Sequence, residues 1–212
     1  TLFRSLYLSG SPLASGGTFT QADLAAGNVT YSHDGSETTA DAFTFTVSDG
    51  AGGSISATTF NITVTPVNDL PVITNLNGDS TNFVAGGSAV NIDVSGNAAI
   101  SDADSANFNG GNLTITNTGG TNNGSFSVDG TTVTSGGDGV IAAGEGISVG
   151  GVVIGTVSAD GQGGNTLTIT FNANATPARI TTLLNNVLYT APSTLGARNF
   201  SVTVNDGSGT SA

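Results

Sequence analysis

The stretch Phe43–Ser54, FTFTVSDGAGGS, decides the fold of this chain, because it recurs almost position by position as FSVTVNDGSGTS at Phe200–Ser211. In both copies, apolar and polar residues alternate, which is the period of a half-buried β-strand. An Asp-Gly pair follows each strand and is typical of a turn. The chain therefore carries two copies of one strand-and-turn unit.

The repeat extends upstream of this stretch. Thr20 and Thr176 are good helix N-caps, and Pro177 suits a first helical position, so we expect a short helical turn in each copy. A further strand follows each turn: NVTYS at 28–32 and NVLYT at 186–190. Each copy thus reads as helical turn, strand, loop, strand and Asp-Gly turn.

A linker with two prolines, PVNDLP at Pro66–Pro71, separates the copies. Proline suits chain that leaves a sheet, because it cannot donate to a ladder. We therefore expect residues 1–68 to be the C-terminal part of one module, truncated at its N-terminus. Residues 69–212 would be a second module that lacks its final strand. A Gly-rich insertion at about 119–164 would add extra hairpins to it, one of them turning at Asp129-Gly130.

The composition excludes several function classes. The chain has 32 Gly, 15 acidic residues against three Arg, and a formal net charge of −12. This balance excludes nucleic acid as a partner and disfavours an anionic membrane surface. No apolar run approaches the roughly 20 residues that span a bilayer, so we expect no direct membrane insertion. With only 8% charged residues, the chain is not a disordered acidic tail.

Catalysis is not expected. His33 is the single histidine, and no G-x-S-x-G nucleophile elbow occurs. Paired acids could serve a glycosidase, but they sit at turns in repeated positions, and nothing indicates a cleft lined by aromatic residues. We predict that the chain is not an enzyme.

The direction of the strands brings several acids toward one junction. The chain enters each tandem module at one pole and leaves it at the other. The last strand runs toward the exit pole, so the antiparallel penultimate strand runs toward the entry pole. Asp206 follows the penultimate strand and therefore lies at the entry pole of the second module. Asp34 and Glu37 precede the penultimate strand of the first module and lie at its exit pole, while Asn68 and Asp69 are in the linker. Four carboxylates without a base need a cation. Oxygen ligands without His or Cys indicate calcium.

A second acidic loop, ISDADSANFNGG, contains Asp102 and Asp104. The two acids, with Asn107 and Asn109, have the character of a calcium loop but not the spacing of an EF-hand. The residues alone leave open at which pole this loop lies.

These motifs resemble those of cadherins. PVNDLP resembles the DxNDNxP linker, ISDADS the DxD motif, TVNDG the AxD motif and HDGSE the LDRE motif. The first module is similar to the chondroitin-sulfate-proteoglycan-type, cadherin-like tandem repeats of large bacterial RTX, type I-secreted surface adhesins. This resemblance implies an all-β fold of tandem cadherin-like, Ig-like Greek-key β-sandwiches with one short helical turn per module.

The resemblance also implies a set of calcium ligands. It places the Asp102 loop at the junction and assigns Ca²⁺ to seven residues: Asp34, Glu37, Asn68, Asp69, Asp102, Asp104 and Asp206. The chain departs from the family pattern at Pro66, which replaces a carboxylate, and at Ser48 and Asn205, which replace alanine. We therefore expect binding in the weak range of extracellular modules, about 10⁻⁴–10⁻³ M.

The expected function is a calcium-stabilised structural spacer of a bacterial cell-surface adhesin, in cell adhesion or in attachment to extracellular matrix or biofilm. Its partners would be neighbouring tandem modules, with cell-surface glycans or another copy of itself as further candidates. Two alternatives stay open: a calcium-dependent carbohydrate-binding module, and a subunit of an extracellular filament or sheath.

Overall fold

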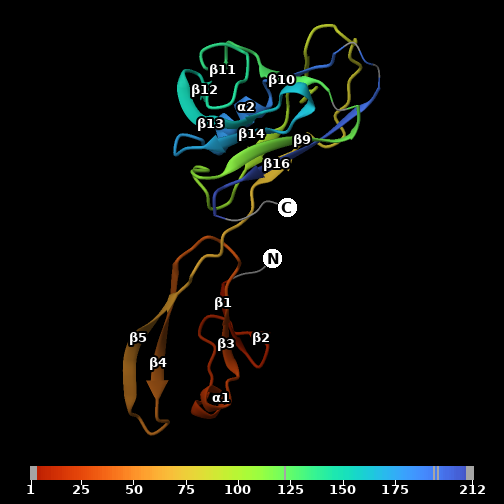
Figure 1. Ribbon diagram of the computed structural model, residues 1–212. Coiled ribbons are helices and arrows are strands. Elements are labelled where there is room, and N and C mark those ends of the chain that lie inside the picture. Colours follow the sequence, from red (N-terminus) through yellow and green to blue (C-terminus); the bar gives the residue numbers. More distant parts are fainter. Residues whose placement is uncertain (1–3, 122, 193, 195, 209–212) are drawn as a thin grey trace. The chain divides into compact units, whose positions relative to one another are not determined.

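The computed structural model describes residues 4–121, 123–192, 194 and 196–208. The chain divides into two compact units, Thr1–Val67 (unit 1) and Asn68–Ala212 (unit 2). Antiparallel strands dominate both units, which confirms the prediction of an all-β chain (Figure 1). The last residues of the second copy of the repeat, 209–211, lie outside the described residues.

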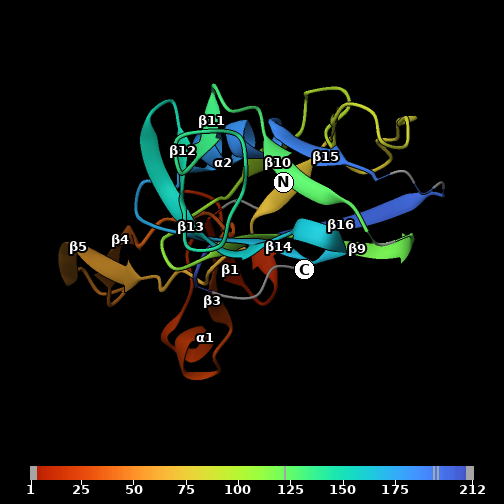
Figure 2. The same ribbon diagram turned by 45° about the horizontal axis from the view of Figure 1, so that its top comes forward.

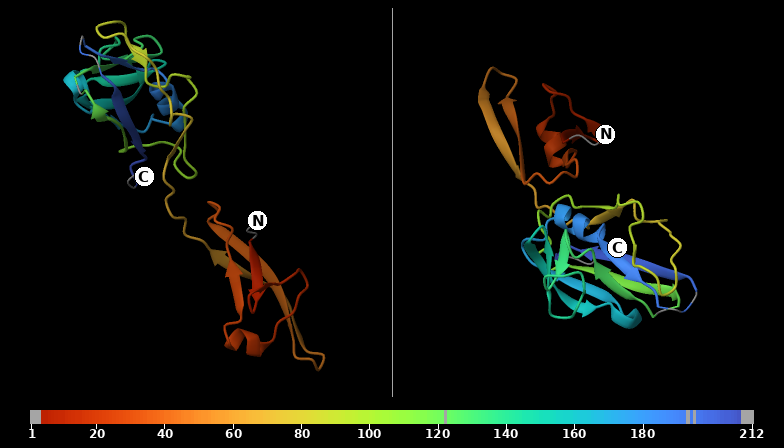
Figure 3. Two further views of the ribbon diagram at one scale, coloured as in Figure 1. Left: turned by 90° about the vertical axis from the view of Figure 1, so that its right-hand side faces the viewer. Right: turned by 90° about the horizontal axis from the view of Figure 1, so that it is seen from above.

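Unit 1 consists of two small antiparallel sheets and one short helix. The first sheet has the order β2-β1-β3, and the second is the hairpin β4-β5, which Figure 3 shows clearly. Helix α1 begins after the predicted N-cap Thr20, whose side chain accepts the N–H of Asp23 in a reciprocal capping box. The elements are β1 (Ser5–Leu8), β2 (Ser11–Pro12), α1 (Gln21–Ala25), β3 (Val29–Ser32), β4 (Ala40–Ser48) and β5 (Ser54–Thr63).

The side chains of unit 1 remain accessible to solvent. Phe43 and Phe60 stack across the hairpin with their ring centroids 5.1 Å apart, yet Phe60 is 53% exposed. No described residue of this unit is fully buried. An isolated two-stranded hairpin is marginally stable in water, so β4 and β5 gain little from packing within this unit.

Unit 2 is a sandwich of strands with one two-turn helix. Its large antiparallel sheet has the order β11-β12-β13-β14-β9-β16, and β10-β15-β7 lies over it (Figure 2). The short pair β6-β8 completes the unit. Its elements are β6 (Val72–Thr74), β7 (Val90–Asn91), β8 (Ala99–Ser101), β9 (Asn112–Gly120), β10 (Ser125–Val128), β11 (Val133–Ser135), β12 (Gly146–Val149), β13 (Val152–Asp160), η1 (Gln162–Gly164), β14 (Leu167–Phe171), α2 (Pro177–Leu184), β15 (Val187–Thr190) and β16 (Arg198–Asn205).

The core of unit 2 follows from the alternation of its strands. Leu113 and Ile115 of β9 and Leu167 and Ile169 of β14 are each 0% exposed, and their polar neighbours face solvent. Burial of each such side chain contributes about 1.5–3 kcal/mol. Helix α2 adds three buried residues, Ile180, Leu183 and Leu184. It starts as predicted, with Thr176 as N-cap and proline at the first helical position.

The Gly-rich region 119–164 is part of this sandwich. It supplies β11, β12 and β13, which form half of the large sheet, and β10, which pairs with β15. The hairpin predicted at Asp129-Gly130 is wrong, although Gly130 does turn the chain with φ +71°. The strand before the turn, β10, and the strand after it, β11, pair with β15 and β12 and not with each other. Long-range pairing therefore overrides the local hairpin signal.

Candidate metal centre

The loop with Asp102 and Asp104 follows β8, and two contacts fix that strand. β8 pairs antiparallel with β6, and its Ile100 N–H donates to the hydroxyl of Thr181 on α2 at 2.9 Å. The loop then folds on itself, because Asp102 Oδ1 accepts the N–H groups of Asp104 at 3.1 Å and Ser105 at 2.8 Å. These bonds leave the second carboxylate oxygen of Asp102 to face inward.

Asp206 reaches the same place from the end of β16. Asn205 pairs with Asn112 of β9, and Asp206 follows as the strand ends. Gly111 and Gly207 allow the two chain segments to meet here, since a Cβ at Gly207 would lie 2.4 Å from the carbonyl oxygen of Asn109. Asp206 is only 3% exposed, and such burial is rare for an aspartate.

The structure thus brings together Asp102, Asp104 and Asp206, whose nearest carboxylate oxygens all lie within 4.8 Å of one another. Ser105 connects the two chain segments, because its hydroxyl donates to Asp206 Oδ2 at 3.3 Å. Asp102 Oδ2 is buried and has no hydrogen-bond partner among the described residues. A buried carboxylate oxygen without a donor is costly, so this atom is suited to contact a cation.

Electrostatics at the cluster favour a positive partner. Burial raises the pKa of the Asp102 carboxyl above its ordinary value. The neighbouring Asp104 carboxylate raises this pKa further, against the opposing hydrogen bonds from the N–H groups of Ser105 and Asp104. A bound cation would reverse both effects, because it favours the ionised form of each carboxyl.

The linker end lies against this cluster. The backbone N–H of Asp69 donates to Asp104 Oδ2 at 3.2 Å, and the side-chain amide of Asn68 donates to the carbonyl of Asp69 at 2.8 Å. A small hollow next to the cluster is lined by Asp69, Leu70, Val72, Ser101, Asp102 and Ala103. The structure therefore places the backbone of Asp69 against Asp104, whereas Asn68 contacts Asp69 alone in these bonds.

Asp34 and Glu37 belong to unit 1, in the loop between β3 and β4. Asp34 accepts hydrogen bonds from the hydroxyl and N–H of Ser36, which lower its pKa together with the Arg4 guanidinium at 3.6 Å. The sequence gives no sign that Arg4 is a partner of Asp34, because 30 positions separate the two residues. His33 also lies beside Asp34, and its ring bonds to the Thr38 hydroxyl at 2.8 Å.

Ser105 is a residue of the site that the sequence motifs did not indicate. Its hydroxyl contacts Asp206 and its backbone N–H contacts Asp102. An aspartate that bonds the backbone two residues on indicates a turn in DADS, but the contact of the Ser105 hydroxyl with Asp206 joins residues 101 positions apart and has no local signal.

The donor set can hold a hard divalent cation. Three carboxylates offer up to six oxygens, without nitrogen or sulfur ligands, and this set fits calcium better than zinc or copper. The buried, unpartnered Asp102 oxygen is the observation of this structure that supports the fit.

Comparison with known proteins agrees with the fold of unit 1. Residues 5–64 match the family model described as cadherin-like, which confirms that part of the predicted resemblance. Over 61 residues, 28% of this chain, the sequence is 52% identical to the human "Extracellular matrix organizing protein FRAS1". The matched stretch covers 2% of that protein's length. No solved structure matches the chain.

The matched stretch and the all-β architecture are typical of structural and adhesive extracellular modules. Among the residues that the structure describes, no helix has the length and apolar character needed to cross a membrane.

Proposed function

We propose that unit 2 binds one calcium ion through Asp102, Asp104 and Asp206, and that the chain is a calcium-stabilised spacer of an extracellular adhesive protein. The observation that carries the proposal is the meeting of these three carboxylates around the unpartnered Asp102 oxygen. Repulsion among the three carboxylates destabilises the calcium-free unit, and a bound divalent cation removes this repulsion.

Calcium would also fix the start of unit 2. The N–H of Asp69 already contacts Asp104, so an ion at the cluster would hold the segment Asn68–Pro71 against the loop. The Asp69 carboxylate is a further ligand under this proposal. Water would complete the six to eight oxygens that calcium takes.

The adhesive role rests on the cadherin-like stretch and on its similarity to a protein named for organising the extracellular matrix. Neighbouring tandem modules are the proposed partners, and a bacterial cell surface is the proposed location. Abundant external calcium would stabilise the module only after it leaves the cell.

Thermal unfolding of the whole chain tests the calcium site. With a dissociation constant of about 10⁻⁴ M, 10 mM calcium adds about 2.7 kcal/mol to the stability of the folded state. For a unit of this size, that corresponds to a rise in Tm of about 5–10 °C over a chelator. Magnesium should give much less, because it demands a tighter octahedral shell.

The matched variants are Asp104→Asn and Asp138→Asn. Both remove one exposed acid from unit 2, but only Asp104 belongs to the cluster. Asp104→Asn should abolish most of the calcium shift and Asp138→Asn should retain it. Equal shifts in the two variants, or equal effects of calcium and magnesium, would contradict the proposal.

A further inference from the structure

Unit 2 contains three asparagines that are each followed by glycine: Asn77, Asn109 and Asn123. Asparagine is a thermally labile residue, and it is most labile before glycine, which has no Cβ to shield its backbone nitrogen. This nitrogen attacks the side-chain amide carbon of the asparagine and closes a five-membered succinimide ring. The attack requires a glycine N–H that is free of other bonds and an asparagine side chain that can turn back toward it.

Gly110, which follows Asn109, has an engaged nitrogen. Its N–H donates to the carbonyl of Phe171 at 3.1 Å, and the neighbouring N–H of Gly111 donates to the carbonyl of Phe108 at 3.0 Å. Ring closure at Asn109 would first have to break the bond between Gly110 and Phe171. The fold therefore protects this pair.

Asn123 has an immobilised side chain. Its Oδ1 accepts a hydrogen bond from the Arg198 guanidinium at 2.9 Å, and its Nδ2 donates to the hydroxyl of Thr194. The charge of the guanidinium strengthens the first of these bonds. Because both polar atoms of the amide are held, its carbon cannot turn toward the nitrogen of Gly124 without the loss of both bonds. The fold protects this pair as well.

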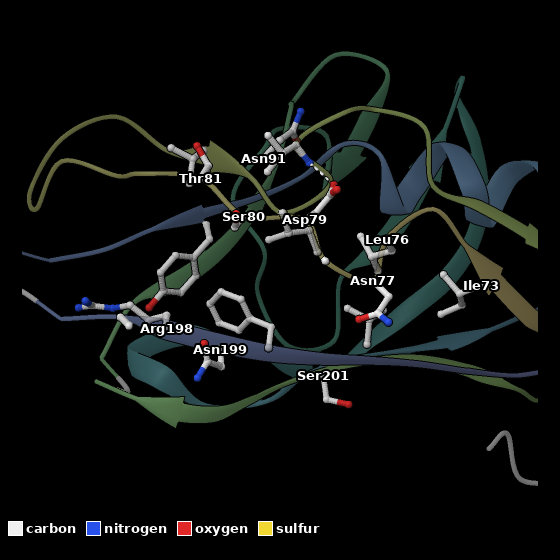
Figure 4. A pocket seen from close by; sticks show the side chains of 18 of the residues that line it. Ile73, Leu76, Asn77, Asp79, Ser80, Thr81, Asn91, Arg198, Asn199 and Ser201 are labelled. Carbon is white, nitrogen blue, oxygen red and sulfur yellow. Dashed lines mark hydrogen bonds between the residues drawn. The ribbon is translucent and has the colours of Figure 1, made fainter.

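Asn77 lacks both forms of protection. It lies in the turn after β6, which closes through a bond from the Asp79 N–H to the Leu76 carbonyl at 3.2 Å. Among the described residues, neither the N–H of Gly78 nor the side-chain amide of Asn77 has a hydrogen-bond partner. Figure 4 shows this turn, with the Asn77 amide and the Asp79 carboxylate pointing in different directions.

We infer that Asn77 is a site of spontaneous deamidation in the folded chain, and that the fold spares Asn109 and Asn123. In the first step, the Gly78 nitrogen bonds to Cγ of Asn77 and loses its proton, while the side-chain nitrogen leaves as ammonia. In the second step, water opens the succinimide at one of its two carbonyl carbons. Cleavage of the bond to Cγ gives aspartate, and cleavage of the bond to the main-chain carbonyl carbon gives isoaspartate. No electrons are exchanged.

The two products have different effects on the turn. Aspartate adds a negative charge and leaves the course of the main chain unchanged. Isoaspartate routes the main chain through Cβ and Cγ, so the turn closed by Leu76 and Asp79 becomes longer. Asp79 also accepts the N–H of Val94 at 2.8 Å, which ties the turn to the segment before β8. A longer turn displaces Asp79 from this bond, so we expect isoaspartate to destabilise unit 2.

Ageing of the whole chain tests the inference. The chain is incubated at mildly alkaline pH, which favours loss of the proton from the attacking nitrogen. A chelator is present, so that the outcome is independent of the calcium site. Peptide mapping by mass spectrometry should show deamidation at Asn77 at least about tenfold faster than at Asn109 or Asn123. The same incubation in urea is the control. There the three sites should react at similar rates, because the protecting bonds are lost.

Two variants separate the reaction from its effect on the turn. Asn77→Gln should stop the reaction here, because attack on the longer side chain would have to close a larger ring. Asn77→Asp carries the charge of the first product and should unfold in urea like the unaltered chain. The isoaspartate fraction of the aged chain should unfold at a lower urea concentration than Asn77→Asp, and equal unfolding of the two would contradict the effect on the turn.

Two results would overturn the inference itself. One is deamidation of the folded chain at Asn109 or Asn123 as fast as at Asn77. The other is an unmodified Asn77 in the folded chain over the time in which the unfolded chain reacts fully.

Discussion

The hydroxyl of Ser105 donates a hydrogen bond to Oδ2 of Asp206, a residue 101 positions further along the chain, at 3.3 Å. This contact joins the loop after β8 to the end of β16 and orients one of the three clustered carboxylates. Groups that orient a metal ligand typically change metal affinity when they are removed.

Ser105→Ala should therefore weaken calcium binding about tenfold, as measured by titration calorimetry. The backbone N–H of residue 105 still reaches Asp102, so the loop keeps its turn. Ser148→Ala, in strand β12 outside the cluster and its hollow, is the control and should bind like the unaltered chain. If both variants bind equally well, Ser105 does not orient the site.

Asp102→Asn should have opposite effects with and without calcium. Without calcium, the neutral amide removes a carboxylate whose pKa is raised by burial and by Asp104, so the unit should gain a small amount of stability. With calcium, the variant loses a ligand and its stabilisation. Urea unfolding with calcium and with a chelator measures both effects, and a loss of stability in the chelator would show that the carboxylates do not repel.

Gly207→Ala should disrupt the metal centre. Gly207 has φ +93°, and a Cβ there would meet the Asn109 carbonyl oxygen at 2.4 Å. Gly137→Ala is the matched control, because Gly137 has φ +111° and a Cβ there would have no other atom within 4 Å. We expect a loss of about 1–2 kcal/mol for the control, and a further loss of about 1–3 kcal/mol from overpacking for Gly207→Ala. Thermal unfolding of the two variants measures the difference, and equal losses would mean that the two chain segments separate easily at this point.

The stability of unit 2 should depend on pH through Asp129. Although burial raises its pKa, hydrogen bonds from Thr131, Thr132 and Val133 lower the pKa to about 2. Because the folded pKa lies below the ordinary value of 3.8, ionised Asp129 stabilises the folded state above about pH 4. This stabilisation is lost as the pH falls from about 4 to 2.

The comparison of the unaltered chain with Asp129→Asn isolates this contribution. Since Asp129 is partly exposed, we expect a difference in unfolding free energy of at most about 1 kcal/mol at about pH 6. The difference should vanish near pH 2 in urea unfolding. A difference that is independent of pH would assign the effect of Asp129 to packing alone.

Local signals in the sequence predicted the local structure well. The alternation in the two repeat copies predicted β4 and β16, and the caps at Thr20 and Thr176 predicted where α1 and α2 begin. The sequence did not reveal which strands pair. The Asp129-Gly130 turn lies between β10 and β11, but their partners are β15 and β12, because pairing is decided by burial across the whole sandwich.

Part of the candidate site could be predicted from the sequence. The DAD loop and the acid after β16 are the residues that the structure brings together, whereas Ser105 and the close approach at Gly207 depend on three-dimensional contacts. Calcium ligation by all seven predicted residues remains a prediction. The contact between Arg4 and Asp34 could not be predicted, because 30 positions separate the two residues in the sequence.

The pairing of β16 with β9 has a mechanical consequence. All eight residues of β16 face β9 in one antiparallel ladder, and the Asp206 carboxylate follows at its end. A force directed along β16 would load these backbone hydrogen bonds together in shear, and not one after another as in unzipping. Unit 2 should therefore resist tension along this strand far better than the isolated hairpin β4–β5, whose two ends lie on the same side and peel apart bond by bond.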